Sequence, residues 1–352
     1  MKSNMNNSEE KSTMAGINWY PGHMAKAKRT LEENLKLVNI VIELCDARLP
    51  FSSRNPEIDR ILGNKPRVLV FNKADLADPK MNAYWEKYYA DKGYRVLFTD
   101  AKSGDGVKKV INGIYEAMAE KIQNAKERGR RTPTIYAMIV GIPNVGKSSF
   151  INRVAGKAVA ETGDKPGVTR AKQWLNMSDD IYLLDTPGML WPRIENQIAA
   201  HKLAASGAVK DDVVDTGELT AYLLTTIEEH YPEAINDRFG IKTQDIDTEG
   251  DELDYITTSI IGSSKLVRGL KILEECGRKR GCLIKGGEID YQRAAAIVLD
   301  EFRAGKFGKI TLDFPDCIEE DAKIREINKE NDKAREERRI ERKKNYKRRN
   351  NR

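Results

Sequence analysis

Residues 141–149, with the sequence G-I-P-N-V-G-K-S-S, constrain the fold of this chain more than any other stretch. The apolar run before them, residues 135–140, predicts a buried strand, and the pattern of residues 150–154 predicts a helix. Between a strand and a helix, a G-x-x-x-x-G-K-[ST] motif indicates a phosphate-binding loop, because its glycines let backbone N–H groups approach a polyphosphate. A plain glycine turn is the alternative, and both flanks disfavour it. The stretch therefore predicts a nucleoside triphosphate site.

Individual residues of this loop have expected roles. Lys147 is expected to reach the outer phosphates and to assist catalysis, and the Ser148 hydroxyl is expected to bind Mg²⁺. The residues of the loop expected to contact the nucleotide are Asn144, Val145, Gly146, Lys147, Ser148 and Ser149.

A second motif, N-K-x-D, stands at the carboxyl end of the apolar run at residues 67–71. The Asp75 carboxylate can accept hydrogen bonds from the ring N–H and the exocyclic amine of guanine, a donor pair that adenine lacks. The Lys73 stem can lie along the base, and Asn72 can tie this loop to the phosphate loop. Alone, the motif is a common surface turn. Beside a phosphate loop it predicts guanine specificity.

Three shorter motifs extend the pattern. The sequence D-A-K follows a predicted strand at residues 94–99, and there we expect the Ala101 N–H to meet the guanine O6, with Lys102 beside it. Thr169, in the loop P-G-V-T, is expected to complete the Mg²⁺ shell and to assist catalysis.

The third of these motifs is D-x-x-G, after the predicted strand at residues 181–184. Asp185 is expected to hold Mg²⁺, commonly through a water, and the Gly188 N–H to sense the terminal phosphate. Each short motif is weak alone, but together they complete a guanine-nucleotide set.

The order of these motifs is rotated, because N-K-x-D and D-A-K precede the phosphate loop. Further motifs are W-Y-P-G-H-M-A-K-A from Trp19 and D-A-R-x-P-x-S-x-x-N-P from Asp46. With these motifs, residues 17–310 resemble the circularly permuted GTPases, and among them the ribosome biogenesis GTPase A family. One departure is Asp100, where the family usually has Ser. It affects only loop geometry, because the Ala101 backbone is the group expected at the base.

The resemblance implies an α/β fold, in which a circularly permuted P-loop GTPase domain precedes an all-α C-terminal domain and a basic tail. We expect a mostly parallel sheet with helices on both faces. Strands are predicted at residues 38–45, 67–71, 94–99, 135–140, 172–177 and 181–184, and helices at 23–37, 56–62, 80–92, 107–123, 150–154, 216–230, 254–276 and 291–304. The expected units are a disordered segment 1–15, a GTPase domain 16–195, a helical RNA- or ribosome-binding domain 196–312 and a charged basic tail 313–352.

The resemblance also assigns two finer roles. Many GTPases place a water-orienting Gln after D-x-x-G, but this chain has Met189 there. In the family a catalytic histidine lies in P-G-H-M, which implies that His23 orients the water, although a helix cap is the alternative. Similar GTPases with Asn at this position use it to help hold K⁺, which implies the same role for Asn144. The alternative is that Asn144 only stabilises the loop. GTP or GDP and Mg²⁺ are the implied cofactors, with K⁺ as a possible third.

Charge is concentrated at the C-terminus. Residues 321–352 contain fourteen Lys or Arg and seven Asp or Glu, a net charge of +7, whereas the whole chain has +6. Such a tail indicates a polyanionic partner. The loop at residues 277–287 is basic and punctuated by glycines, which suits a nucleic-acid backbone, although a solvated charge run is the commoner explanation. In the family this domain docks on ribosomal RNA.

Other features exclude several classes. Four cysteines and three histidines form no zinc-like spacing, and residues 1–13 form no apolar signal-peptide core. No apolar run approaches the length of a membrane span. We therefore expect a monomeric cytoplasmic protein without a membrane partner.

The motifs predict a GTP hydrolase, and the resemblance implies that it acts in assembly of the large ribosomal subunit, binds its rRNA and is stimulated by the ribosomal particle. Because the chain enters the C-terminal domain soon after Gly188, the nucleotide state is expected to be coupled to that domain. The alternatives are a GTP-sensing RNA-binding scaffold with little turnover and a permuted GTPase of the small subunit.

Overall fold

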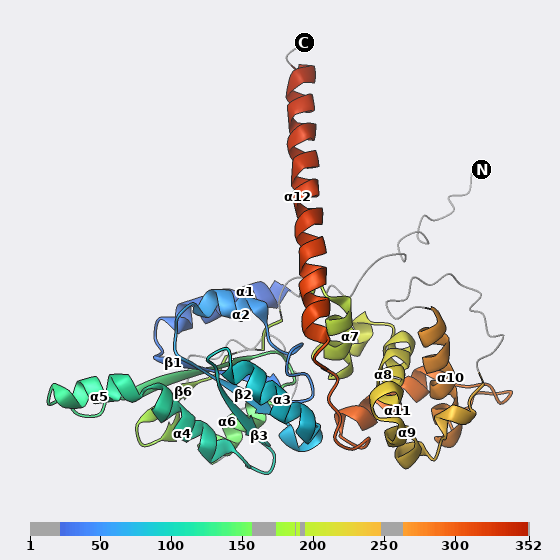
Figure 1. The fold of residues 1–352 in the computed structure, drawn as a ribbon, viewed down its shortest axis with the longest axis horizontal. Helices are drawn as coiled ribbons and strands as arrows, with labels where there is room; N and C mark the ends of the chain where they lie inside the picture. Colours follow the sequence, from blue (N-terminus) through green and yellow to red (C-terminus); the bar gives the residue numbers. More distant parts are fainter. Residues whose placement is uncertain (1–21, 157–173, 187, 191–193, 248–262, 351–352) are drawn as a thin grey trace, which may run out of the picture.

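The computed structural model describes residues 22–156, 174–186, 188–190, 194–247 and 263–350. A six-stranded sheet forms the N-terminal half, in the order β3-β2-β1-β4-β6-β5 (Figure 1). Its strands are β1 (Ile40–Asp46), β2 (Arg67–Asn72), β3 (Arg95–Thr99), β4 (Ile135–Gly141), β5 (Trp174–Ser178) and β6 (Ile181–Leu184). All pairs are parallel except β5 with β6. The mostly parallel sheet is thus confirmed.

The central strand explains the continuous apolar pattern. All seven residues of β1 are buried, because β2 and β4 flank it and helices cover the sheet. In β2, Val68 and Val70 belong to one apolar cluster, whereas Leu69 and Phe71 pack in another with Trp85 of α3. Successive residues of a strand face opposite sides, so helices cover both faces of the sheet.

The helices of this half are α1 (Gly22–Leu35), α2 (Pro56–Leu62), α3 (Pro79–Ala90), α4 (Val107–Ala117), α5 (Ala119–Glu127) and α6 (Lys147–Ala155), with the short η1 (Ala74–Leu76) after β2. The single helix predicted at residues 107–123 is wrong in one respect, because the chain bends at Met118 (φ −105°, ψ 6°). Met118 is buried and ends the apolar stripe of α4, so α5 continues without a core to cover.

The second half is helical, as expected. It contains α7 (Gln197–Ala205), η2 (Asp211–Val213), α8 (Thr216–His230), α9 (Pro232–Phe239), η3 (Thr243–Asp245), α10 (Ser263–Lys279) and α11 (Tyr291–Arg303). Helices α8 and α10 approach so closely that a Cβ on Gly269 would lie 2.3 Å from the Ala221 carbonyl oxygen. The sequence did not predict α9, which buries only Ile235 and Phe239.

After α11 the chain returns to the sheet domain. The Ile310 N–H donates to Leu76 O at 3.0 Å and the Leu312 N–H to Arg48 O at 2.8 Å. Asp313, placed at the start of the expected tail, is fully buried. The final helix, α12 (Cys317–Asn350), then extends away from both halves (Figure 1). None of the described helices has the length and apolar character that a membrane span requires.

Candidate functional site

The carboxyl ends of four neighbouring strands bring the predicted loops together. Asp46 pairs in register with Asn72, Asn72 with Thr99, and Leu44 with Gly141. In open α/β sheets this edge is where ligands bind. The loops carrying N-K-x-D, D-A-K and the phosphate-binding motif therefore meet at one edge, although they are far apart in the sequence.

The phosphate loop has the backbone that its glycines permit. Asn144 and Gly146 adopt left-handed conformations, with φ of 57° and 94°. A Cβ on Gly141 would lie 2.4 Å from Leu44 O, and one on Gly146 would lie 2.3 Å from Asn72 Nδ2. The first glycine thus allows close packing on β1, and the second allows contact with the N-K-x-D loop.

Lys147 opens α6 with a buried side chain that faces the loop. Its Nζ donates to Gly141 O at 3.1 Å and to Ile142 O at 2.7 Å. Burial lowers its pKa to about 8, against an opposing effect of Asp185. Gly188 is adjacent, since a Cβ there would lie 2.8 Å from Lys147 Nζ. A buried ammonium on backbone carbonyls suits a loop that receives anionic oxygens.

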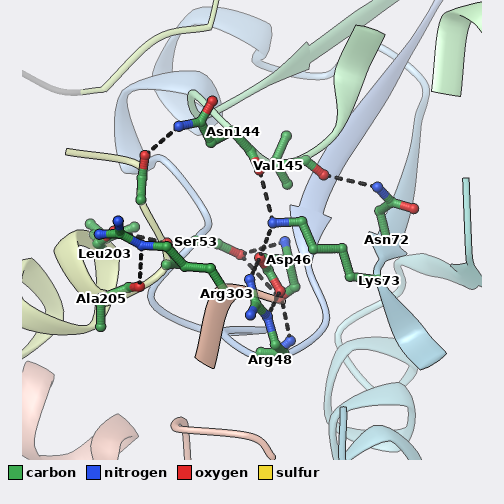
Figure 2. A network of polar contacts seen from close by, with 12 residues as sticks. Asp46, Arg48, Ser53, Asn72, Lys73, Asn144, Val145, Leu203, Ala205 and Arg303 are labelled. Carbon is green, nitrogen blue, oxygen red and sulfur yellow. Dashed lines mark hydrogen bonds and ion pairs between the residues drawn. The ribbon is translucent and has the colours of Figure 1, made fainter. Parts of the chain in front are cut away.

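Asn72 joins the base-side loops to the phosphate loop. Its Nδ2 donates to Val145 O at 2.9 Å (Figure 2). Its Oδ1 accepts from the Ala101 N–H at 3.0 Å and from Thr99 Oγ1 at 3.2 Å. The Ala101 N–H, which we expected at the guanine O6, is therefore engaged with Asn72 in this structure.

Lys73 makes a second bridge between the two loops. Its Nζ donates to Asp46 Oδ2 and to Asn144 O, both at 2.8 Å (Figure 2). Its backbone is left-handed, with φ of 61°, which turns the chain into η1. Asp75 lies in η1 with an exposed side chain. The carboxylate predicted to read the base is thus beside the bridged loops and open to solvent.

The Asp100 departure has a local explanation. Its carboxylate accepts from the Lys102 N–H at 2.8 Å and from the Ser103 N–H at 3.2 Å, which closes the loop. Burial acts to raise the pKa of Asp100, but these hydrogen bonds outweigh it and leave the pKa below its usual value. An aspartate can therefore organise this loop, while Lys102 remains exposed.

Sequence reasoning assigned no role to Asp46 and Arg48, which lie beneath the bridge. The Arg48 guanidinium binds both Asp46 carboxylate oxygens, at 3.0 and 2.9 Å. It also donates to Phe302 O at 3.2 Å and lies over the Phe302 ring. Burial acts to raise the pKa of Asp46, but Arg48 and Lys73 hold it well below its usual range. The only signal in the sequence was the D-A-R motif.

Asn144 contacts the helical half. Its Nδ2 donates to Gly207 O at 2.5 Å (Figure 2). Arg303 of α11 holds the same turn, donating to Ala204 O at 3.0 Å and to Ala205 O at 3.1 Å. The phosphate loop therefore contacts the C-terminal half through Asn144, and the loop after β1 contacts it through Arg48.

The remaining predicted residues are only partly described. Ser148 lies in the first turn of α6, Ser149 follows it, and Asp185 follows β6. Thr169 lies outside the described residues, as does the side chain of His23, which is the second residue of α1. The described part of the chain contains no group of three or more His, Cys, Asp or Glu placed to hold a metal. A divalent cation at Ser148 and Asp185 would thus need phosphate oxygens and water as further ligands.

The fold and this site define a class. A strand–loop–helix phosphate site, joined to an N-K-x-D loop that comes earlier in the chain, is the arrangement of a circularly permuted P-loop GTPase. A family model described as 50S ribosome-binding GTPase matches residues 136–242.

Full-length relatives identify the family. The chain is 43% identical over 305 residues to a ribosome biogenesis GTPase A of Priestia megaterium, covering 86% of this chain and 99% of the relative. It is 35% identical to the mouse mitochondrial ribosome-associated GTPase 1, over 84% of this chain and 89% of that protein. The GNP-bound structure of Thermotoga maritima YlqF has a TM-score of 0.55 at 26% identity, covering 82% of this chain and 98% of that one. The chain belongs to the ribosome biogenesis GTPase A family. It binds GTP and GDP and hydrolyses GTP.

Proposed function

We propose that this GTPase is an assembly factor for the large ribosomal subunit, that it binds rRNA, and that its nucleotide state controls the docking of its C-terminal helices. Two hydrogen bonds support the coupling between the nucleotide site and the C-terminal helices: Arg48 donates to Phe302 O, and Asn144 donates to Gly207 O. The description of the matching family model, with its reference to the 50S subunit, supports the large subunit. We further propose that the protein acts in the cytoplasm as a monomer.

Within this proposal the two loops hold opposite ends of GTP. Asp75 receives the guanine, Lys73 and Asn72 fix the base loop, and Lys147 neutralises charge on the outer phosphates. The proposed polar contacts of the phosphates come from Asn144, Val145, Gly146, Ser148 and Ser149, with Gly188 at the terminal phosphate. Ala101 and Lys102 complete the base side once Ala101 releases Asn72.

The metal and the attacking water need separate residues. Ser148, Asp185 and Thr169 would hold Mg²⁺, which neutralises charge as the phosphoryl group is transferred. We propose His23 as the group that orients the water, because the thioether side chain of Met189 has no donor and is only a weak acceptor. Asn144 would hold K⁺ only through its carbonyl oxygen Oδ1, since Nδ2 is a donor bound to Gly207.

Fewer basic side chains of the helical half are available for RNA than the sequence indicated, because two of its arginines form ion pairs. In the 277–287 loop, Arg278 pairs with Glu274, and Arg280 pairs with Glu301. Lys279 and Lys285 are exposed, beside exposed Leu283 and Ile284. We therefore propose that the two lysines and α12 supply the phosphate contacts of this half.

Sedimentation with purified large and small ribosomal subunits tests the proposal. With a non-hydrolysable GTP analogue we expect binding to large subunits, weaker binding with GDP, and loss of both at high salt. Selective binding to small subunits would support that alternative instead. GTP turnover that large subunits do not stimulate, combined with nucleotide-dependent binding, would favour the scaffold.

A further inference from the structure

Helix α5 projects from the end of the GTPase domain opposite α8–α11 (Figure 1). It joins the half of the domain that carries N-K-x-D to the half that carries the phosphate loop. None of its nine residues is buried. Ile122, which is partly buried, is its main apolar contact with the rest of the domain. Core packing therefore explains little of why this helix is present.

The exposed cations of this segment define what we name the basic spur. Its members are Lys121, Lys126, Arg128, Arg130 and Arg131. A defined turn holds the three arginines, because the Gly129 N–H donates to Lys126 O at 2.9 Å and the Arg130 N–H donates to Ala125 O at 2.9 Å. Gly129 supplies the left-handed conformation, with φ of 66°, that this type of helix end needs.

The spur differs from the other arginine-rich regions in its pairing. Most arginines of the folded halves pair with a described carboxylate, as do Arg48, Arg54, Arg60, Arg67, Arg95, Arg238, Arg268, Arg278, Arg280 and Arg303. No member of the spur forms an ion pair with a described residue. Glu127, which precedes Arg128 in the sequence, accepts a hydrogen bond from Gln123 at 2.9 Å.

This pairing pattern points to an external anion. An exposed guanidinium without a carboxylate partner keeps all its donors for a phosphate, which it can bind through two parallel hydrogen bonds. The three guanidinium groups lie within residues 128–131, and no acidic residue stands between them. Their positive charges therefore add along the turn. A nucleic-acid backbone supplies phosphates in a row and is the partner that this charge density fits.

We propose that the basic spur is a second RNA-binding surface, through which the GTPase domain itself contacts rRNA phosphates. This inference rests on the proposed ribosomal function and adds a contact at the far end from the C-terminal helices. Two separate contacts with one particle raise the total affinity more than either alone. They also fix the orientation of the GTPase domain on the RNA.

The test compares two triple variants of the full chain. The first carries Arg128→Gln, Arg130→Gln and Arg131→Gln. The matched control carries Lys80→Gln, Lys87→Gln and Lys92→Gln, which removes three exposed charges from α3 and its end. We would measure binding to purified large ribosomal subunits and to poly(U), with the GTP analogue, between about 0.05 and 0.2 M salt.

For the spur variant we expect at least about a tenfold loss of affinity at low salt, and a salt slope smaller by about two for three lost phosphate contacts. Its GTP affinity, ribosome-free GTP turnover and thermal midpoint should equal those of the wild type, because the three side chains form no ion pair with the described residues. The control should bind as the wild type does.

Three results would overturn the inference. The first is a spur variant whose affinity for large subunits and salt slope equal those of the wild type. The second is an equal loss of affinity in the control variant. The third is a spur-dependent contact that survives digestion of the RNA, which would indicate an acidic protein partner. A wild-type chain that binds no ribosomal particle would instead remove the proposed function on which the inference rests.

Discussion

At the scale of single residues, the site is defined by side chains that connect loops. Asn72 and Lys73 each link a base-side loop to the phosphate loop, while Asp75 beside them stays exposed. Lys147 is buried on carbonyl oxygens with a lowered pKa. Two predictions concern these residues, because each has a chemical signature that a general loss of folding cannot imitate.

Asp75→Asn should change the preferred base. The amide has one acceptor and one donor group, so it loses one guanine contact and opposes a guanine donor with its own NH₂. Xanthine has a carbonyl where guanine has an amine and should pair better with the amide. We expect GTP affinity to fall by at least about a hundredfold and xanthosine triphosphate affinity to rise. Calorimetric titration with both nucleotides measures this, and a parallel loss of both affinities would contradict the assignment.

Lys147 should link nucleotide binding to pH. Its folded pKa of about 8 lies below the ordinary 10.5, so between these values the unfolded chain binds more protons than the folded one. The nucleotide-free protein should therefore gain stability as pH rises through this window. Phosphates favour the charged amine, so GTP binding should take up a proton above about pH 8 and weaken as pH rises further. Calorimetry in buffers of different ionisation enthalpy measures the uptake, and equal enthalpies near pH 8.5 would contradict it.

At the scale of elements, the helical half is attached to the loops and not only to the sheet. The turn after α7 accepts a hydrogen bond from Asn144 and is fixed by Arg303, which also pairs with Asp211. Arg48 reaches α11 from the loop after β1. These contacts are the ones through which we expect a change in either loop to reach α7 or α11.

A double-mutant cycle between Asn144→Gly and Arg303→Ala should show this coupling. Glycine tolerates the left-handed backbone of residue 144, so the variant removes the side chain without strain. We expect the two effects on GTP affinity to be non-additive by about 0.5–3 kcal/mol.

Arg238→Ala provides the control, since Arg238 pairs with Glu301 in the same half and forms no hydrogen bond or ion pair with the described residues of the loops. It should combine additively with Asn144→Gly. Additivity in the Arg303 cycle as well would show that Asn144–Gly207 carries no coupling.

At the scale of the whole molecule, Asp313 connects three segments. Its carboxylate accepts from the Phe51 and Ser52 N–H groups at 2.9 and 2.7 Å, and from Lys202 Nζ at 3.1 Å. Trp85 Nε1 donates to its carbonyl at 3.0 Å. Burial acts to lower the pKa of Lys202, but Asp313 outweighs it and holds the amine charged.

Asp313→Ala should destabilise the protein by about 3–5 kcal/mol, because it leaves the Lys202 ammonium buried without its partner. Denaturant unfolding measures this loss in the free energy of unfolding. The double variant Asp313→Ala with Lys202→Met should recover part of it, since the unpaired charge is gone. A loss below about 1 kcal/mol would show that the pair is solvated and weak.

Much of the fold could be predicted from the local pattern of apolar and polar residues. The strand predicted at residues 67–71 is β2, Arg67–Asn72, because a strand buried on both faces requires a continuous apolar run. The N-K-x-D, D-A-K and phosphate-loop motifs also meet at one sheet edge, as parallel strands require. The contact between Arg48 and Phe302 could not be predicted, because the two residues lie 254 positions apart and periodicity does not specify which buried surfaces meet. For the same reason, the burial of Asp313 was not foreseen.

Helix α12 has 34 residues and so spans about 50 Å, while its base is fixed where Cys317 is buried and Asp313 binds the Phe51–Ser52 backbone. That backbone follows Arg48 by only a few residues. A tilt of about 10° at the base would carry the far end roughly 9 Å. We therefore expect a small rearrangement near Asp46 to displace the far end of α12 by a larger distance than the loop itself moves.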